Sequence, residues 1–211
     1  MEKNRCYIAG AGDFCETALP KPEDYIIAAD AGYTALTSRN ITPDVIIGDF
    51  DSLGFVPEHP NVIRSSVEKD DTDMMLAVKL GLLLGFTRFT INGGLGGRID
   101  HTFSNIQTLA YLTEHGAIGK LYSNDACITA IKNSTYKFTS EKVVAGNIIS
   151  VFCKSEKAKG VTIKGFKYPL DNATLTNINP IGISNEFTGT DASIEVKHGV
   201  LVIMWDNIAK R

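Results

Sequence analysis

The chain has 211 residues, enough for one large domain or two small ones, and its 44% hydrophobic and 21% charged residues are ordinary for a soluble globular protein. Its net charge of −3 and the lack of a long Lys/Arg block argue against non-specific nucleic-acid binding. No apolar run is long enough for a signal-peptide core or a membrane span, so we expect a cytoplasmic protein. The four cysteines have neither CxxC nor zinc-like spacing, which favours reduced thiols.

The first half of the chain alternates short strand patterns with helical ones, which is typical of βαβ units and a mainly parallel sheet. A helix is predicted after Asp71-Thr72-Asp73, with Asp71 or Thr72 as its N-cap and an end near Gly85. A second helix is predicted from Thr102 to His115, and Gly116 is placed to end it. The predicted strands are Tyr7–Ala9, Tyr25–Ala29, Val45–Ile47, Val62–Ile63 and Arg88–Ile91.

After Leu121 the pattern changes to short segments rich in β-branched residues and separated by turn residues, which favours an antiparallel sandwich or barrel. His198-Gly199 is predicted to form a hairpin turn between the last two strands. We therefore expect an α/β domain with a mainly parallel, Rossmann-like sheet at residues 1–122 and an all-β sandwich or barrel at residues 123–211. The predicted strands here are Ile128–Ile131, Tyr136–Phe138, Ile148–Phe152, Val161–Ile163, Ala192–Val196 and Val200–Met204.

Acidic residues gather in three clusters in the first half of the chain. The first follows the apolar run Val45-Ile46-Ile47, so its carboxylates are expected where a buried strand ends, which is where open α/β sheets bind ligands. If the backbone is extended there, Asp49 and Asp51 point the same way while Phe50 turns into the core. The clusters are Gly48-Asp49-Phe50-Asp51-Ser52, Lys69-Asp70-Asp71-Thr72-Asp73 and Gly97-Arg98-Ile99-Asp100-His101.

Crowded carboxylates repel one another unless a cation joins them, and hard oxygen ligands of this kind suit Mg²⁺, which bridges to substrate phosphates. The sequence therefore predicts a magnesium-dependent site for a phosphorylated substrate. Acidic turn residues are the alternative interpretation for the first cluster, and ordinary helix capping is the alternative for the second.

The segment Gly93-Gly94-Leu95-Gly96-Gly97-Arg98 follows a strand and precedes a helix. Its backbone N–H groups can approach an anion closely, and Arg98 can grip phosphate oxygens with two hydrogen bonds. It lacks the Gly-Lys-Ser/Thr ending of a P-loop, and a flexible connector is the alternative interpretation.

The segment Gly10-Ala11-Gly12 follows an earlier strand. It has Cys15 where a dinucleotide fingerprint needs a third glycine, which argues against NAD binding. Asp30 adds a further acidic strand end.

In combination, these motifs resemble the thiamin pyrophosphokinase family. Their order and spacing fit along nearly the whole chain, and the layout of an α/β domain followed by a β domain matches as well. One departure is Ala31, where the family often has a second glycine. The matching segments are Ala29-Asp30-Ala31-Gly32, Gly48-Asp49-Phe50-Asp51-Ser52, Lys69-Asp70 with Thr72-Asp73, Gly94-Leu95-Gly96-Gly97-Arg98 with Asp100-His101, and Ile183-Ser184-Asn185-Glu186.

The resemblance implies a transferase, a diphosphotransferase that moves pyrophosphate from ATP to the hydroxyl of thiamin and gives thiamin diphosphate and AMP. It implies that Asp49, Asp51 and Asp73 bind Mg²⁺ and that Arg98 and Asp100 join them as catalytic residues, although it leaves open which carboxylate is the general base. It also implies a homodimer whose thiamin site lies between the α/β domain of one subunit and the β domain of the other. The residues implied to bind ATP are Asp30, Lys69, Asp70, Thr72, Gly96, Gly97, Arg98 and His101, and those implied to bind thiamin are Asp100, Ser184, Asn185 and Glu186.

Other functions stay open at this stage. A related pyrophosphokinase acting on another alcohol, such as a hydroxymethylpterin, would have the same phosphate and metal motifs. A non-catalytic nucleotide-binding sensor would be expected to have lost a carboxylate cluster, and all three are intact here. A metal-dependent phosphohydrolase would need a water molecule positioned at the phosphorus.

Overall fold

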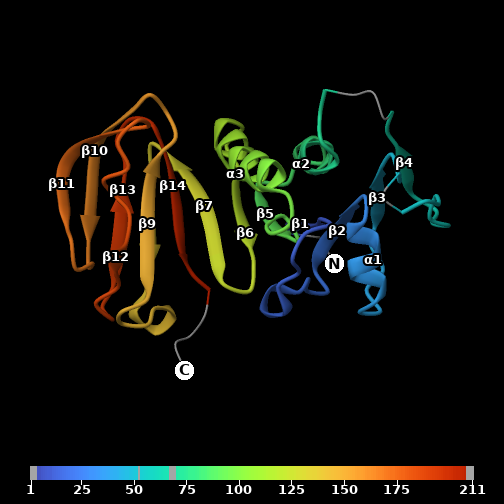
Figure 1. Cartoon of the computed structure of the whole chain (residues 1–211), viewed down its shortest axis with the longest axis horizontal. Coiled ribbons are helices and arrows are strands. Elements are labelled where there is room, and N and C mark those ends of the chain that lie inside the picture. The colour runs from blue at the N-terminus through green and yellow to red at the C-terminus, as the bar shows by residue number, and fades with distance from the viewer. Residues whose placement is uncertain (1–3, 52, 67–69, 208–211) are drawn as a thin grey trace. The chain divides into compact units, whose positions relative to one another are not determined.

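The computed structural model describes residues 4–51, 53–66 and 70–207 of a chain that divides into two compact units, Met1–Asn124 and Asp125–Arg211 (Figure 1). The strands of the N-terminal unit are β1 (Arg5–Ala9), β2 (Asp24–Ala29), β3 (Val45–Gly48), β4 (Val62–Arg64), β5 (Arg88–Asn92) and β6 (Ile118–Tyr122). They pair in parallel in the order β6-β5-β1-β2-β3-β4, so the predicted α/β architecture with a mainly parallel sheet is confirmed.

The order of these strands places a topological switch point beside β1. Within the sheet, β2, β3 and β4 follow one another on one side of β1, and β5 and β6 lie on the other side of β1. In open α/β sheets, ligands bind outside the carboxyl ends of the strands at such a reversal. Such a reversal leaves a crevice at the carboxyl ends of the strands, here between the turns after β1 and β5.

Helices connect the strands of the N-terminal unit, namely η1 (Glu16–Ala18), α1 (Gly32–Thr37), α2 (Asp73–Leu83) and α3 (Ile99–Glu114). Because parallel crossovers are right-handed, the connection from β2 to β3 and the opposite one from β5 to β6 place α1 and α3 on different faces of the sheet. The side chain of Thr72 caps α2 by accepting a hydrogen bond from the backbone N–H of Met75 at 3.2 Å, as predicted.

The helix α3 begins at Ile99 rather than at the predicted Thr102, so Asp100 and His101 lie in its first turn. Because these two residues are polar, the apolar periodicity of the helix begins only after them, and the predicted start was therefore too late. Gly116, at φ +71°, follows its end as predicted.

Phe50 joins the core of the N-terminal unit. It is 3% exposed and packs in a cluster with buried side chains of β1, β2, α1 and β3. Its burial agrees with the prediction, but its φ of +64° is left-handed rather than extended. The extended backbone predicted between Asp49 and Asp51 is therefore wrong, although their carboxylate oxygens lie within 4.8 Å of each other.

The C-terminal unit is built of antiparallel strands, which confirms the predicted all-β region. The strands are β7 (Ala126–Lys132), β8 (Thr135–Phe138), β9 (Ile148–Cys153), β10 (Lys157–Lys164), β11 (Leu170–Thr176), β12 (Asn185–Glu186), β13 (Ala192–Glu195) and β14 (Val200–Asp206), with a short helix η2 (Ser140–Lys142). They pair in the orders β12-β9-β14-β7 and β11-β10-β13-β8. Buried side chains from both groups, including Phe138, Ile163, Leu201 and Ile203, form one apolar core.

The predicted hairpin at His198-Gly199 is wrong. The strand before it, β13, pairs with β8 and β10, whereas the strand after it, β14, pairs with β7 and β9. The turn therefore carries the chain from one sheet to the other across the edge of the core. Both strands contribute buried residues to that core, among them Ile194 and Leu201. Their alternation of buried and exposed residues is therefore the same as that of two strands paired in a hairpin, and the sequence pattern does not distinguish the two cases.

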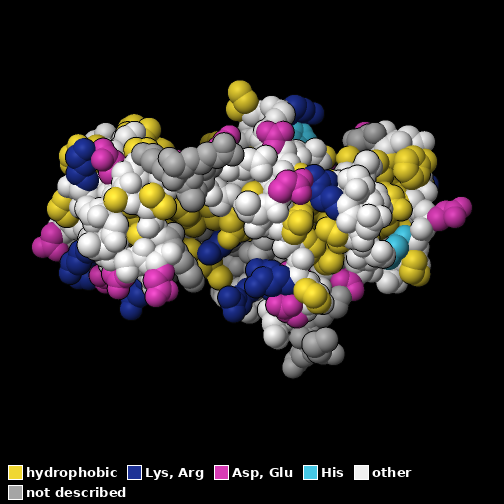
Figure 2. Space-filling model, turned by 90° about the horizontal axis from the view of Figure 1, so that it is seen from below, with side chains coloured by type: hydrophobic (Ala, Val, Ile, Leu, Met, Phe, Trp, Pro, Cys, Tyr) yellow, Lys and Arg dark blue, Asp and Glu magenta, His cyan; other side chains and the backbone are white. Residues whose placement is uncertain are grey.

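Within the described part of the chain, no helix is long and apolar enough to cross a membrane. On the face shown in Figure 2, acidic and basic side chains are both present among neutral ones, in keeping with the small net charge. The cysteines Cys6, Cys15, Cys127 and Cys153 all belong to the described residues, and none of them forms a disulfide there.

Candidate functional site

A pocket of about 560 Å³ opens in the N-terminal unit outside the carboxyl ends of the strands. Its walls come from the turns after β1 and β5, from Asp30 at the end of β2, and from the first turns of α2 and α3. It therefore lies at the topological switch point. The predicted site residues that line it are Asp30, Thr72, Asp73, Gly96, Gly97, Arg98, Asp100 and His101.

Two glycine turns form adjoining walls of the pocket in direct backbone contact. The N–H of Gly12 donates to the carbonyl of Gly93 at 2.6 Å, and a Cβ on Gly12 would lie 2.3 Å from the carbonyl oxygen of Leu95. Gly93 has φ +70°, and a Cβ there would lie 2.4 Å from the carbonyl oxygen of Gly10. Only glycine allows this approach, and it leaves backbone rather than side chains facing the pocket.

Several pocket residues were not predicted as site residues. Gly10, Ala11 and Gly12 follow a strand, and this pattern was a usable signal for a nearby ligand. Asn105 gave no such signal, because it lies inside a helical pattern. Its side chain donates to the carbonyl of Gly94 at 2.8 Å and so ties α3 to the second glycine turn.

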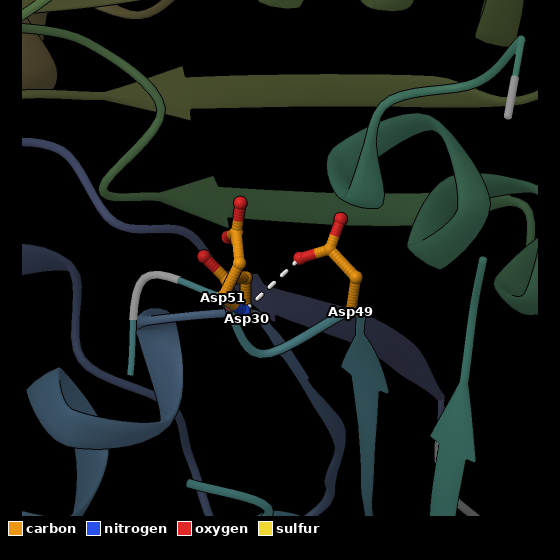
Figure 3. A group of neighbouring side chains, drawn as sticks. All are labelled: Asp30, Asp49 and Asp51. Atoms are coloured by element: carbon orange, nitrogen blue, oxygen red, sulfur yellow. Dashed lines mark hydrogen bonds between the residues drawn. The ribbon is translucent and has the colours of Figure 1, made fainter. Parts of the chain in front are cut away.

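Three carboxylates meet beside the pocket. Asp30, Asp49 and Asp51 each offer an oxygen within 4.8 Å of the others (Figure 3). The backbone N–H of Asp51 donates to Oδ1 of Asp49 at 3.3 Å. Oδ1 of Asp30 is buried and has no hydrogen-bond partner within the described ranges, an arrangement that favours a bound cation over a solvated acidic loop. The donor set of three carboxylates fits a hard divalent cation such as Mg²⁺.

The second acidic cluster is divided by the start of α2. Asp73 lines the pocket in the first turn and accepts a hydrogen bond from Oγ of Ser65 at 3.3 Å. It is not part of the group formed by the three strand-end carboxylates. Thr72 is the N-cap, and Asp70 is exposed on the preceding loop and does not line the pocket. Lys69 lies outside the described residues.

Arg98 and Asp100 form an exposed, two-bonded ion pair at the pocket. Nε donates to Oδ1 at 3.1 Å and Nη2 donates to Oδ2 at 2.6 Å, with the side chains 72% and 64% exposed. The guanidinium, together with the backbone N–H of His101 at 3.0 Å, lowers the pKa of Asp100 to about 2. While the pair is intact, Asp100 is an ionised but weakly basic carboxylate.

The residues expected to bind thiamin in the C-terminal unit have different surroundings. Asn185 is buried, and its amide is occupied, because it accepts from the N–H of Tyr168 at 2.9 Å and donates to the carbonyl of the same residue at 2.7 Å. Glu186 pairs with Nζ of Lys167 at 2.8 Å. Ser184 is exposed at φ +58°. Asn185 therefore holds the Tyr168 segment against β12, and Ser184 and Glu186 are the more available polar groups.

A switch-point pocket with glycine turns, converging carboxylates and an arginine is what an α/β enzyme needs to bind and transfer the phosphates of a nucleotide. The class that this fold and site define is a nucleotide-dependent phosphotransferase. Comparison with known proteins then gives the family.

Two family models match the chain. The model for the thiamin pyrophosphokinase catalytic domain matches residues 17–118, and the model for the vitamin B1 binding domain of the same family matches residues 135–201. The chain is 30% identical to thiamine pyrophosphokinase of Bacillus subtilis (strain 168) over 184 residues, which cover 84% of this chain and 85% of that protein. The chain belongs to the thiamin pyrophosphokinase family.

Solved structures agree with this assignment. A crystal structure of thiamine pyrophosphokinase from Bacillus subtilis superposes with a TM-score of 0.84 at 27% identity, covering 97% of this chain and 100% of that one. A thiamin pyrophosphokinase structure from Candida albicans shares the fold, with a TM-score of 0.77 at 15% identity over 97% of this chain and 89% of that one. The predicted family, fold class and activity are thus confirmed: the protein is a diphosphotransferase with thiamin pyrophosphokinase activity.

Proposed function

We propose that ATP binds in the pocket of the N-terminal unit, with its phosphates against the turn that contains Gly96 and Gly97. Backbone N–H groups there and the positive end of α3 favour an anion. Arg98 and Lys69 would hold phosphate oxygens, with Thr72 and His101 beside them. The assignment of residues 1–122 as the ATP- and magnesium-binding catalytic domain rests on this pocket and on the match to the family's catalytic model.

Magnesium is proposed to bind at the acidic strand ends. Asp49 and Asp51 would hold the ion together with Asp30, whose buried Oδ1 would gain the partner that it lacks among the described residues. Asp73 would face the same phosphates from the start of α2, as an additional ligand or through water. When bound, the ion would neutralise charge on the phosphate oxygens of ATP.

The reaction proposed at this site is a single displacement. The hydroxyl oxygen of thiamin forms a bond to the β-phosphorus of ATP, the bond from that phosphorus to the oxygen bridging to the α-phosphorus breaks, and AMP leaves with the electron pair. The hydroxyl proton passes to a carboxylate. Positioning and charge neutralisation carry such a transfer, and the protein forms no covalent bond to the substrate.

Asp100 is proposed to orient the hydroxyl. Its lowered pKa makes it a weak base as long as Arg98 is its partner. When Arg98 turns to a phosphate, the pKa of Asp100 rises and the carboxylate becomes a better proton acceptor.

The β domain predicted at residues 123–211 is proposed to bind thiamin through Ser184, Glu186 and the segment held by Asn185. Its match to the vitamin B1 binding model supports this. We further propose a cytoplasmic homodimer in which thiamin lies between the α/β unit of one subunit and the β unit of the other. Exposed apolar side chains just before Ser184 support an interface there, namely Ile178, Ile181 and Ile183.

The test is to identify the products formed from ATP, Mg²⁺ and thiamin by mass spectrometry, with a control that lacks the metal. Thiamin diphosphate and AMP in equal amounts, both absent without Mg²⁺, are expected. Asp49→Asn should reduce both products together, because it keeps the size of the side chain and removes its charge.

Other products would contradict parts of the proposal. ADP with thiamin monophosphate would show that a different phosphorus is attacked, and AMP or ADP formed without thiamin would indicate a phosphohydrolase. Turnover only with another alcohol, such as a hydroxymethylpterin, would change the acceptor. Nucleotide binding without any product would indicate a sensor.

A further inference from the structure

Asn92 is the last residue of β5, beside the turn that follows β1. Its side chain is 0% exposed, and a polar group buried to this degree is tolerated only when it is fully hydrogen-bonded. Its Oδ1 accepts from the backbone N–H of Cys15 at 2.8 Å and of Gly93 at 2.9 Å. Its amide thus joins the segment after β1 to the segment after β5.

The amino group of the same side chain makes further bonds to the first segment. Nδ2 donates to the carbonyl of Cys15 at 2.9 Å, to the carbonyl of Ala18 at 3.2 Å and to Oη of Tyr7 at 2.9 Å. Apart from the bond that Oδ1 accepts from Gly93, the hydrogen bonds of this amide go to residues 15–18 and to Tyr7 on β1.

The opposite end of this segment forms a wall of the pocket. Gly10 and Gly12 line it, and their N–H groups donate to the carbonyls of Asn92 at 2.7 Å and Gly93 at 2.6 Å. Backbone bonds thus hold residues 10–12, and the Asn92 side chain holds residues 15–18. The backbone bonds and the Asn92 side chain together fix the position of residues 10–18 beside the glycine turn after β5.

We propose that Asn92 is a positioning residue for the nucleotide site. It sets where residues 10–18 lie against the glycine turn after β5, and so it sets the width of the pocket. Asn92 does not itself line the pocket, so it acts through Gly10 and Gly12 rather than by touching the substrate. This inference rests on the proposed function, because it requires that ATP bind in this pocket.

The chemistry of an amide explains why asparagine suits this position. An aliphatic side chain would leave the N–H groups of Cys15 and Gly93 without their partner. Aspartate would keep the shape and the two acceptor bonds, but it would place a carboxylate where Nδ2 now donates to the carbonyls of Cys15 and Ala18. Asn92→Asp therefore removes the donor bonds to residues 15–18 and keeps the acceptor bond to the N–H of Cys15.

The test compares steady-state constants and thermal stability of Asn92→Asp with those of the wild-type protein. The KM for ATP should rise roughly tenfold, because small displacements of a binding wall weaken substrate placement strongly, and the KM for thiamin should stay unchanged. The matched control is Asn147→Asp, which alters another buried asparagine, 5% exposed, in the C-terminal unit. It should lower the Tm without moving the KM for ATP.

A second variant keeps the inference testable if Asn92→Asp does not fold. Tyr7→Phe removes one of the acceptors of Nδ2 and should raise the KM for ATP by a smaller factor. A lowered Tm with an unchanged KM for ATP in these variants would overturn the proposal, as would equal rises in both KM values. Failure of the proposed ATP site would look different, since a change in a residue that lines the pocket, such as Asp73→Asn, would then leave turnover unchanged.

Discussion

At the scale of single residues, Asp71 and Asp73 are two positions apart in the sequence, but only Asp73 faces the pocket. Asp73 lines the pocket, whereas Asp71 pairs with Nζ of Lys79 at 2.5 Å and does not line it. Asp73→Asn is expected to lower turnover by at least about 100-fold, because it removes a charge that is proposed to face the phosphates and the metal. Asp71→Asn is the matched control and should leave turnover near normal, since partly exposed ion pairs contribute only about 0–1 kcal/mol. Equal activity of the two variants in a thiamin diphosphate assay would remove Asp73 from the site.

Arg98 and Asp100 allow a prediction about pH. The guanidinium is the main cause of the lowered pKa, so Arg98→Gln should raise the pKa of Asp100 from about 2 toward its ordinary value of 3.8. The N–H of His101 remains as a weaker cause. A lowered pKa favours the ionised form, so the pairing is present above about pH 4 and is lost as the pH falls through about 2. Carboxyl NMR titration of Asp100 measures the shift, and an unchanged pKa in the variant would show that Arg98 is not its cause.

At the scale of elements, the N-cap of α2 positions the pocket face of this helix. Thr72 Oγ1 accepts the N–H of Met75, so Thr72→Ala should lower the free energy of unfolding by about 1 kcal/mol, and Thr72→Ser should restore most of it. Urea unfolding of the variants tests this. A Thr72→Ala protein as stable as the wild type would mean that the hydroxyl serves a ligand rather than the helix.

The elements that the sequence predicted correctly are those set by local chemistry. Apolar runs ended by turn residues identified β1 to β5, and the cap residue identified α2. The wrong hairpin at His198-Gly199 shows the limit, because the partner of a strand is decided by distant residues that share its core. The strands β6, β11 and β12 were missed: β6 lies at the change of pattern around Leu121, β11 has one buried residue among seven, and β12 has only two residues.

The candidate site was predictable to a similar degree. Asp49 and Asp51 follow an apolar run, so their place at a strand end could be predicted from the sequence. That Asp30 would join them, rather than Asp73, depends on β2 and β3 being neighbours in the sheet. Asn92 could not be recognised, since a single polar residue after a strand has the same pattern as any turn residue.

At the scale of the whole molecule, three isoleucines of the C-terminal unit lie exposed beside the residues proposed to bind thiamin. Ile178 is 88% exposed, and Ile181 and Ile183 are more than half exposed. If they form the dimer interface, the double variant Ile178→Asp with Ile181→Asp should be monomeric in sedimentation experiments, because it would bury charges in an apolar contact. A dimer of unchanged stability would place the interface elsewhere.

A shared site makes a stricter prediction about activity. In a twofold dimer whose sites each combine the α/β unit of one subunit with the β unit of the other, Asp73→Asn and Glu186→Ala can complement each other. A mixed dimer then has one site with both changes and one site with neither. After subunit exchange in an equal mixture, half of the dimers are mixed and one of their two sites is intact, so about a quarter of wild-type activity should return. If each site lies within one subunit, every site keeps a defect and the mixture stays as inactive as its parts.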